Sequence, residues 1–342
     1  KTVIAGYPWF LDWGRDTFIC ARGLLAAGLT DQVHQILLTF ARFEKDGTLP
    51  NTIFGEDASN RDTSDAPLWF ALVYEELAQL VGPIPPTPPI SLPEVLQSIA
   101  SHYAQGTPNA SRMDPASALI WSPAHFTLMD TNYPAGTPRQ GYPVEIQALW
   151  IRLLRQLQRL SPPPQRRRWA ELADRALASF EQLFWNEQRG YYADVLLASP
   201  GQPAAQALAD DALRSNCLIP ISLGLLKGTR ARRCVAAAGR YLVLPGALRS
   251  LAPLPVSVPL PILRPDGSPL NDPLRPYFGR YEGDEDTRRK PAYHNGTAWT
   301  WTFPGFCEAL ARAWDFSPEA LATARAYLAS MAPLLQPGRL AQ

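Results

Sequence analysis

Apolar residues recur at helical spacing along most of this 342-residue chain. The clearest case begins at Val144 and continues through Ile146, Leu149, Trp150, Leu153 and Leu154, which suits the buried face of one helix. Similar spacing marks nine further segments: Thr17 to Leu29, Asp31 to Phe43, Pro67 to Val81, Leu92 to Gln105, Gln165 to Trp185, Asp211 to Leu226, Arg230 to Leu242, Thr297 to Trp314 and Pro318 to Leu335. Strand-like alternation is almost absent, so the sequence predicts an all-α domain of about ten helices.

Breaker residues separate these helices. Gly82 and the proline-rich run after it cannot be helical and predict a stiff surface connection. Prolines recur between Leu244 and Pro276, where we expect an extended irregular loop. Long loops therefore fall on alternate connections, and loops on a rigid scaffold commonly carry functional sites.

The stretch before Val144 is the first candidate site. Thr127 to Pro143 holds two glycines and three prolines, which predicts a loop, and Asp130 follows two apolar residues within it. Glu145 lies in the first turn of the following helix. A carboxyl group among apolar neighbours tends to keep its proton towards neutral pH, as a general acid requires. Alternatively, Asp130 is a turn or cap residue and Glu145 complements the helix dipole.

A second candidate is the WGRDT segment with Trp13, Arg15 and Asp16. Trp13 offers a flat apolar face, while an adjacent Arg and Asp can grip two neighbouring hydroxyls of a sugar ring. The alternative is that Asp16 caps a helix beginning at Thr17, with Arg15 as its ion-pair partner.

Two other segments carry candidate polar groups. Asp65 precedes a predicted helix and either faces the site or caps that helix. Tyr293, His294, Asn295 and Trp299 form a polar and aromatic group ahead of another helix. With four histidines and none at ligand spacing, His294 is expected to donate or accept hydrogen bonds, and we expect no metal and no cofactor.

Composition narrows the class of partner. Lys and Arg total 32 against 31 for Asp and Glu, so no net field attracts nucleic acid or an anionic membrane, and a neutral partner is expected. Aromatic residues in loop-like stretches could offer faces to sugar rings, although aromatic residues more often belong to cores. They are Tyr7, Trp9, Trp13, Tyr133, Tyr142, Tyr281 and Tyr293.

The cysteines and the ends of the chain give little information about function. The four cysteines lack metal spacing, and Cys20 and Cys307 fall in apolar helical patterns typical of small buried residues. No apolar run approaches the ~18 residues of a membrane helix. The chain starts at Lys1 rather than Met, so we expect its natural beginning to be missing.

Three blocks carry a resemblance to a known family. They are AGYPWFLDWGRDTFICARGLLAAGL from Ala5, TLMDTNYPAGTPRQGYPVEIQALWIR from Thr127 and GRYEGDEDTRRKPAYHNGTAWTW from Gly279. In this order they resemble the glucosidase part of glycogen debranching enzymes, the amylo-α-1,6-glucosidases of glycoside hydrolase family 133 in their bacterial, cyanobacterial and archaeal form. The resemblance covers nearly the whole chain.

The resemblance implies a fold and a cellular setting. The fold would be a single (α/α)6 barrel of the six-hairpin type spanning residues 1–342, lacking its last helix because fewer helices are predicted than the barrel has. The chain would be truncated at both ends, without the β-rich domain that precedes the barrel in the family. The expected location is the cytoplasm.

The resemblance also implies the chemistry. The expected reaction is hydrolysis of α-1,6-linked glucose in glycogen or limit dextrin with inversion, with Asp130 as general acid and a glutamate just beyond Gln342 as general base. Glu282 to Asp286 is expected to be a solvated charge run rather than a source of the base. The implied substrate-binding residues are Trp13, Arg15, Asp16, Asp65, Arg139, Glu145, Tyr293, His294 and Trp299.

Two alternatives stay open. Another (α/α)6 α-glucosidase, of glucoamylase or trehalase type, would share the architecture and the acid, because the residues alone do not separate α-1,6 from α-1,4 linkage. A non-catalytic carbohydrate-binding protein would explain a missing base without truncation.

Overall fold

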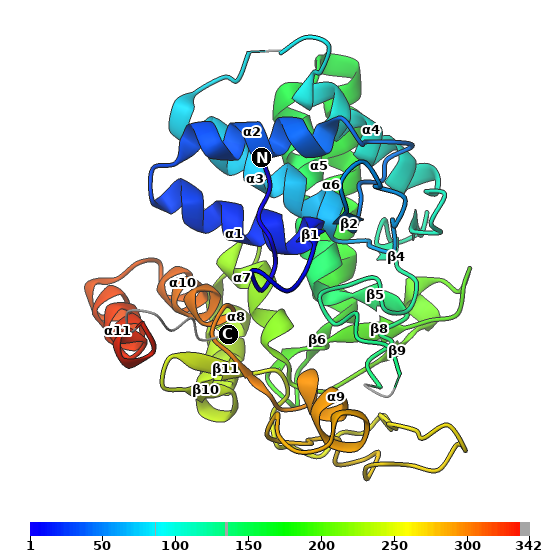
Figure 1. Ribbon diagram of the computed structural model, residues 1–342, viewed down its shortest axis with the longest axis vertical. Coiled ribbons are helices and arrows are strands. Elements are labelled where there is room, and N and C mark those ends of the chain that lie inside the picture. The colour runs from blue at the N-terminus through cyan, green and yellow to red at the C-terminus, as the bar shows by residue number, and fades with distance from the viewer. Residues whose placement is uncertain (86, 134–135, 336–342) are drawn as a thin grey trace.

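The computed structural model describes residues 1–85, 87–133 and 136–335, and this part of the chain is rich in helices (Figure 1). The α-helices are α1 (Gly14–Ala26), α2 (Thr30–Ala41), α3 (Ala66–Val81), α4 (Leu92–Gln105), α5 (Val144–Leu160), α6 (Pro163–Leu183), α7 (Ile219–Ser222), α8 (Gly228–Tyr241), α9 (Lys290–Tyr293), α10 (Phe303–Ala313) and α11 (Pro318–Ala329). The predicted helical class is confirmed.

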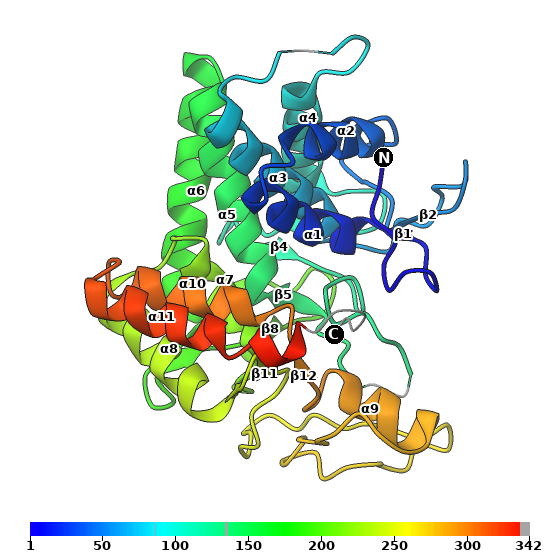
Figure 2. The same ribbon diagram turned by 60° about the vertical axis from the view of Figure 1, so that its left-hand side comes forward.

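Several helices that are not consecutive in the sequence pack against one another. α1 packs on α3, α3 on α5, α5 on α7 and α7 on α10, while α2, α6 and α11 pack on α1, α5 and α10 respectively. Arg22 of α1 forms ion pairs with Glu76 of α3 at 2.7 Å and with Glu308 of α10 at 3.6 Å. The early and late helices of the chain are therefore neighbours. Figures 1 and 2 place α9 and the long loop before it at the opposite end of the molecule from α2 and α4.

The core lies between these helices. α3 is buried on nearly every side from Ala66 to Leu77, as expected of a helix that is apolar all round. Phe18 packs its ring against Phe40 and Phe70, with centroid separations of 4.8 and 5.5 Å. The three rings join α1, α2 and α3 before the chain reaches its central loop.

The loops contain short paired strands. The sequence did not predict these strands. They are β1 (Asp12–Trp13), β2 (Thr52–Ile53), β3 (Arg112–Met113), β4 (Ile120–Trp121), β5 (Gly141–Pro143), β6 (Trp185–Asn186), β7 (Tyr191–Tyr192), β8 (Val195–Leu197), β9 (Leu208–Ala209), β10 (Val243–Leu244), β11 (Ala247–Arg249) and β12 (Ala298–Trp299). They pair as β1–β2, β3–β4, β5–β8–β9, β6–β7 and β10–β11–β12, and every pair is antiparallel. Two or three residues are too few to show strand alternation in a sequence.

Several predicted element boundaries were wrong. Residues 211–226 form only a 3₁₀ turn, Ser215–Leu218, followed by the short α7. α10 begins at Phe303 rather than Thr297, because residues 298–299 are held in β12. α11 ends at Ala329, and only a 3₁₀ turn at Ala332–Leu334 follows it.

One burial expectation fails at Cys20, and the two alternatives for Tyr142 are resolved in favour of the core. Cys20 is exposed, whereas Cys307 is buried as predicted. Tyr142 is buried, and its hydroxyl donates to the Gln202 carbonyl at 2.7 Å, so it offers no face to a ligand. By contrast, residues 282–286 are exposed, as predicted for a solvated charge run. Within residues 1–85, 87–133 and 136–335, none of the helices has the length and apolar character needed to cross a membrane.

Candidate active site

The start of α1 is fixed against the loop that precedes α3. Trp13 pairs with Thr52, and the Gly14 amide donates to the Asn51 carbonyl at 2.9 Å. A Cβ at Gly14 would lie 2.7 Å from the Pro50 carbonyl oxygen, so this close approach requires glycine. Because α1 begins here rather than at Thr17, Arg15 and Asp16 lie in its first turn.

Arg15 joins two carboxylates from distant parts of the chain. Its Nε donates to Asp65 Oδ2 at 2.5 Å and its Nη2 to Asp65 Oδ1 at 2.9 Å, while Nη1 donates to Asp130 Oδ2 at 2.8 Å. Burial lowers the pKa of Arg15, but the charges of Asp65 and Asp130 outweigh that effect and raise it. The guanidinium is thus a fixed positive charge at the centre of the site.

Asp65 lies behind Arg15 and does not cap α3, while its direct contact with substrate stays a prediction. It occupies the N-cap position of α3, but its side chain caps no backbone amide. Thr63 does this instead, since its hydroxyl oxygen accepts from the Ala66 amide at 3.2 Å and donates to Asp65 Oδ1 at 2.8 Å. Asp65 is fully buried, so it positions Arg15 without facing solvent.

Asp130 lies in a loop whose two sides are joined by backbone hydrogen bonds at two places. Ser122 and Gly141 exchange backbone hydrogen bonds of 2.7 and 3.1 Å, and the His125 amide donates to the Pro138 carbonyl at 2.9 Å. His125 has φ 63°, an uncommon value for a residue that is not glycine. The Asp130 side chain is 27% exposed and contacts Arg15, which corrects the expectation of apolar surroundings.

Asp16 is the second accessible carboxyl group beside Arg15. Its side chain contacts solvent, yet desolvation by surrounding atoms raises its pKa. The charge of Arg15 opposes this rise and the charge of Asp130 adds to it. Its helix begins at Gly14, two residues earlier, so the alternative of Asp16 as the helix cap was wrong.

The third block contributes an aromatic cluster to the same region. The Tyr293 ring lies edge-on to His294 and Trp299, with centroids 4.8 and 4.6 Å apart, and Trp299 Nε1 donates to the Tyr293 carbonyl at 3.0 Å. Burial, and then the charge of Asp130, raise the pKa of Tyr293 to about 12. Asp130 thus contacts Arg15 of the first block and acts through its charge on Tyr293 of the third.

His294 is buried behind the aromatic cluster. Its carbonyl accepts a short hydrogen bond from Arg214 Nη1, and its Nδ1 lies 3.4 Å from the Thr137 hydroxyl. Burial, helped by nearby arginines, holds its pKa well below the usual value, so the ring is neutral. Among the described residues no three His, Cys, Asp or Glu side chains are arranged to hold a metal ion.

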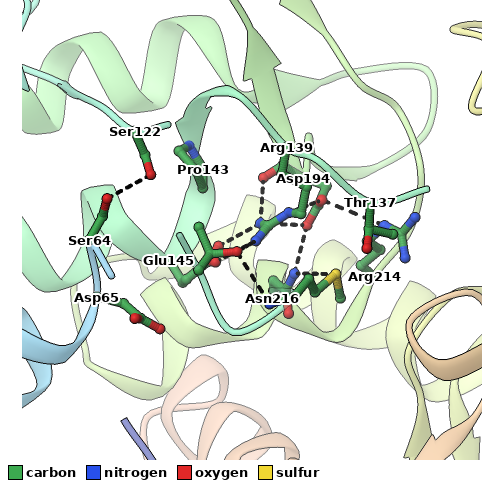
Figure 3. A network of polar contacts seen from close by, with 12 residues as sticks. Ser64, Asp65, Ser122, Thr137, Arg139, Pro143, Glu145, Asp194, Arg214 and Asn216 are labelled. Carbon is green, nitrogen blue, oxygen red and sulfur yellow. Dashed lines mark hydrogen bonds and ion pairs between the residues drawn. The ribbon is translucent and has the colours of Figure 1, made fainter. Parts of the chain in front are cut away.

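Arg139 and Glu145 lie in a separate buried network (Figure 3). Arg139 Nη1 and Nη2 donate to the two Glu145 carboxylate oxygens at 2.6 and 2.7 Å, and Nε donates to Asp194 Oδ2 at 2.7 Å. Arg139 Nη1 also donates to the Thr127 hydroxyl at 2.8 Å. These side chains are no more than 3% exposed, so direct substrate contact by Arg139 and Glu145 stays a prediction.

Sequence reasoning missed other members of this network. Asn216 Nδ2 donates to Asp194 Oδ1 at 2.9 Å, and Arg214 Nε lies 3.6 Å from Asp194 Oδ2. Burial, and then the charge of Asp194, raise the pKa of Asp210 to about 6. A single aspartate inside the apolar run YYADVLL could have indicated Asp194. No comparable pattern indicates Asn216.

Comparisons with known proteins bear on the class of site. The family model described as amylo-alpha-1,6-glucosidase matches residues 1–257 and 262–341. A solved rhamnosidase from Klebsiella oxytoca with rhamnose bound is similar, with TM-score 0.53 and 15% identity over 92% of this chain and 49% of that one. The chain thus spans about half the length of that structure, and the likeness concerns the fold alone.

A GH78-family rhamnosidase of Bacillus sp. GL1 matches more weakly, with TM-score 0.38 and 15% identity over 54% of this chain and 18% of that one. A search among curated proteins gives no significant match.

Proposed function

The chain belongs to the amylo-alpha-1,6-glucosidase family, and from that premise we propose that it forms the site of a glycoside hydrolase that removes α-1,6-linked glucose from branch points of glycogen or limit dextrin, with inversion. The observation that carries the proposal is the Arg15 guanidinium shared between buried Asp65 and accessible Asp130, with Asp16 beside it. These residues come from three segments far apart in the sequence.

We assign the proton transfer to Asp130. As general acid it would protonate the glycosidic oxygen while a water attacks the anomeric carbon from the opposite face. The water's proton would pass to a second carboxylate about 6.5–9.5 Å from the first. The proposed base is the glutamate that the family resemblance places after Gln342. Arg15 would hold Asp130 in position throughout.

The remaining residues around Asp130 would bind the terminal glucose. The Asp16 carboxylate can accept hydrogen bonds from two sugar hydroxyls, and Trp13, Tyr293 and Trp299 can offer aromatic faces to the ring. All three are partly exposed, as contact with a ligand requires.

Arg139, Glu145 and His294 are buried, so their proposed contribution is to position the loops that carry Asp130 and Tyr293.

We propose that the chain is one (α/α)6 domain spanning residues 1–342. The succession of contacts α1–α3–α5–α7–α10 supports an inner ring of helices, and the Arg22–Glu308 ion pair supports closure of that ring between α1 and α10. In such a barrel the loops at one end surround the site, which agrees with the convergence of the three blocks around Asp130.

Glucose release from a branched limit dextrin tests the proposal. The 342-residue chain is compared with one extended through the genomic sequence after Gln342, each with and without Asp130→Asn. We expect the extended, unmutated form to release glucose about 10²- to 10⁴-fold faster than its Asp130→Asn variant and than the 342-residue chain.

Asp315→Asn is the matched control, because Asp315 forms a surface ion pair with Arg232 at 3.3 Å and should leave the rate unchanged. Comparable turnover by the 342-residue chain would place the base within it. Faster hydrolysis of maltose or trehalose than of isomaltose would favour a glucoamylase- or trehalase-type enzyme. Sugar binding without turnover by the extended chain would favour a binding protein.

A further inference from the structure

Four large aromatic side chains project into solvent from two turns next to the candidate site. Tyr7 is 75% exposed, Trp9 82%, Phe10 59% and Phe54 69%. We call these four residues the aromatic platform. Apolar side chains exposed singly are ordinary, but a group of this size on neighbouring turns is typical of a binding surface.

The two turns are tied together through the backbone. The first is closed by the Ala5 amide, which donates to the Leu11 carbonyl at 3.2 Å, and the second by paired hydrogen bonds of 2.9 Å between Phe54 and Asp57. The β1–β2 pairing, in which Asp12 lies opposite Ile53, links them. The aromatic platform is therefore part of a built surface rather than of a loose tail.

The chemistry of this surface suits a neutral ligand rich in hydroxyl groups. Residues 3–11 carry no charged side chain, and the charges on the two turns are the carboxylates of Asp12, Glu56 and Asp57. Aromatic faces can pack against the C–H faces of sugar rings, while carboxylates accept hydrogen bonds from hydroxyls. An anionic ligand would be repelled, and an apolar protein partner would bury these carboxylates without counter-charges.

The aromatic platform leads directly into the candidate site. Only three residues separate Trp9 from Trp13, and a fully extended chain would place Trp9 no more than about 25 Å from Asp16. Figures 1 and 2 show the loop of residues 5–11 beside β1, at the end where α1 begins. A bound chain could therefore touch both the aromatic platform and the Arg15–Asp130 pair.

We propose that the aromatic platform binds the α-glucan chain on the leaving-group side of the scissile bond, beyond the terminal glucose. The identity of the ligand rests on the proposed function. The aromatic platform would then favour longer α-glucan chains over glucose alone, because only a chain can contact the candidate site and the platform at the same time.

Binding of maltoheptaose, measured by isothermal titration calorimetry, tests the proposal on the 342-residue chain. Trp9→Ala and Phe54→Ala should each weaken binding by about 2- to 10-fold, and the double variant by about tenfold or more. Phe316→Ala is the matched control, since Phe316 is 49% exposed on the turn between α10 and α11 and should leave the affinity unchanged. Affinity for glucose alone should not change in any variant.

Other outcomes separate the two proposals. If the double variant binds maltoheptaose as tightly as the unmutated chain, or if the unmutated chain does not bind it, the aromatic platform is not a glucan site. If sedimentation velocity shows self-association that Trp9→Ala abolishes, the surface is a contact between copies and the proposal fails. If the extended chain releases no glucose from limit dextrin while maltoheptaose binding still depends on Trp9, the proposed function fails and the aromatic platform stands.

Discussion

Two clusters in this molecule have the same plan, an arginine held between two carboxylates, but they differ in their access to water. Arg15 grips Asp65 with two hydrogen bonds and Asp130 with one, and Asp130 remains partly exposed. Arg139 grips Asp194 and Glu145 with two hydrogen bonds each, and both carboxylates are fully buried.

The difference in access to water indicates which cluster can react with a substrate and which one stabilises the fold. A carboxylate that meets solvent can bind a substrate hydroxyl or exchange a proton with a reacting group. A carboxylate enclosed with its arginine can only hold segments together, and removing one partner leaves an unpaired buried charge. We therefore expect substitution of Arg139 to cost stability, and substitution of Asp130 to cost activity.

The largest effect on stability is expected for Arg139→Met. It leaves Glu145 buried without its cation and Asp194 with Arg214 at 3.6 Å in place of its closer partner, and should lower the free energy of unfolding by about 3–5 kcal/mol in urea titrations. Arg167→Met is the control, because its ion pair with Glu171 is on the surface and contributes about 0.5 kcal/mol or less. Equal effects of the two substitutions would remove the distinction between the clusters.

Asp210→Asn is expected to raise the free energy of unfolding, by less than Arg139→Met lowers it. The folded pKa of Asp210, about 6, lies above the unfolded value of about 3.9, so the native state binds more protons between these values. This stabilisation is complete below about pH 4 and is lost as the pH rises through about 6.

Asp210→Asn should therefore raise the free energy of unfolding at pH 7.5 by about 1–3 kcal/mol and flatten its dependence on pH between 4 and 7. Urea unfolding across that range is the measurement. Destabilisation of the same size at pH 5 and pH 7.5 would mean that Asp210 acts through its hydrogen bonds and not through its charge.

Thr127→Val examines the connection between the two clusters. The Thr127 hydroxyl accepts from Arg139 Nη1 at 2.8 Å and from the Met129 amide at 3.3 Å, next to Asp130. Losing these contacts should cost about 1–2 kcal/mol of stability. If the buried cluster positions the loop, glucose release by the extended chain should also fall a few-fold at saturating substrate. Unchanged turnover at the same loss of stability would show that the clusters are independent.

The smallest effect on stability is expected where the effect on activity is largest. Asp130→Asn leaves Arg15 paired with Asp65 and removes one negative charge near Asp16, so the free energy of unfolding should change by less than about 1 kcal/mol. Thermal unfolding measured beside the activity assay gives both quantities. A loss approaching that of Arg139→Met would make Asp130 a structural residue.

The sequence predicted most of the helices but few of the long-range links between loops. α4 and the start of α5 fall where the spacing of apolar residues placed them, because a long amphipathic helix encodes its own period. The β5–β8 pairing joins segments about fifty residues apart and rests on close approach. A Cβ at Gly141 would lie 2.1 Å from the Leu196 carbonyl oxygen. No local pattern encodes such a contact.

The same limit applies to the candidate site. Arg15 and Asp65 could be singled out in polar motifs and Asp130 by its two apolar predecessors and the family resemblance, and the structure brings the three together. The separate roles of Asp65 and Asp130 could not be predicted, since they depend on which carboxylate is buried. Asp194 could have been singled out as the one charged residue in an apolar run, whereas Asn216 follows Arg214 and Ser215 in a segment whose pattern does not distinguish it.

The ion pair between Arg22 and Glu308 has a consequence for how the chain folds as it is synthesised. The cluster of Phe18, Phe40 and Phe70 can assemble as soon as the first helices have emerged from the ribosome, because its contacts are local. Until α10 is synthesised, Arg22 can pair only with Glu76, because Glu308 lies nearly the whole chain away. The first helices therefore present an open flank throughout translation, and chaperones are expected to protect that flank.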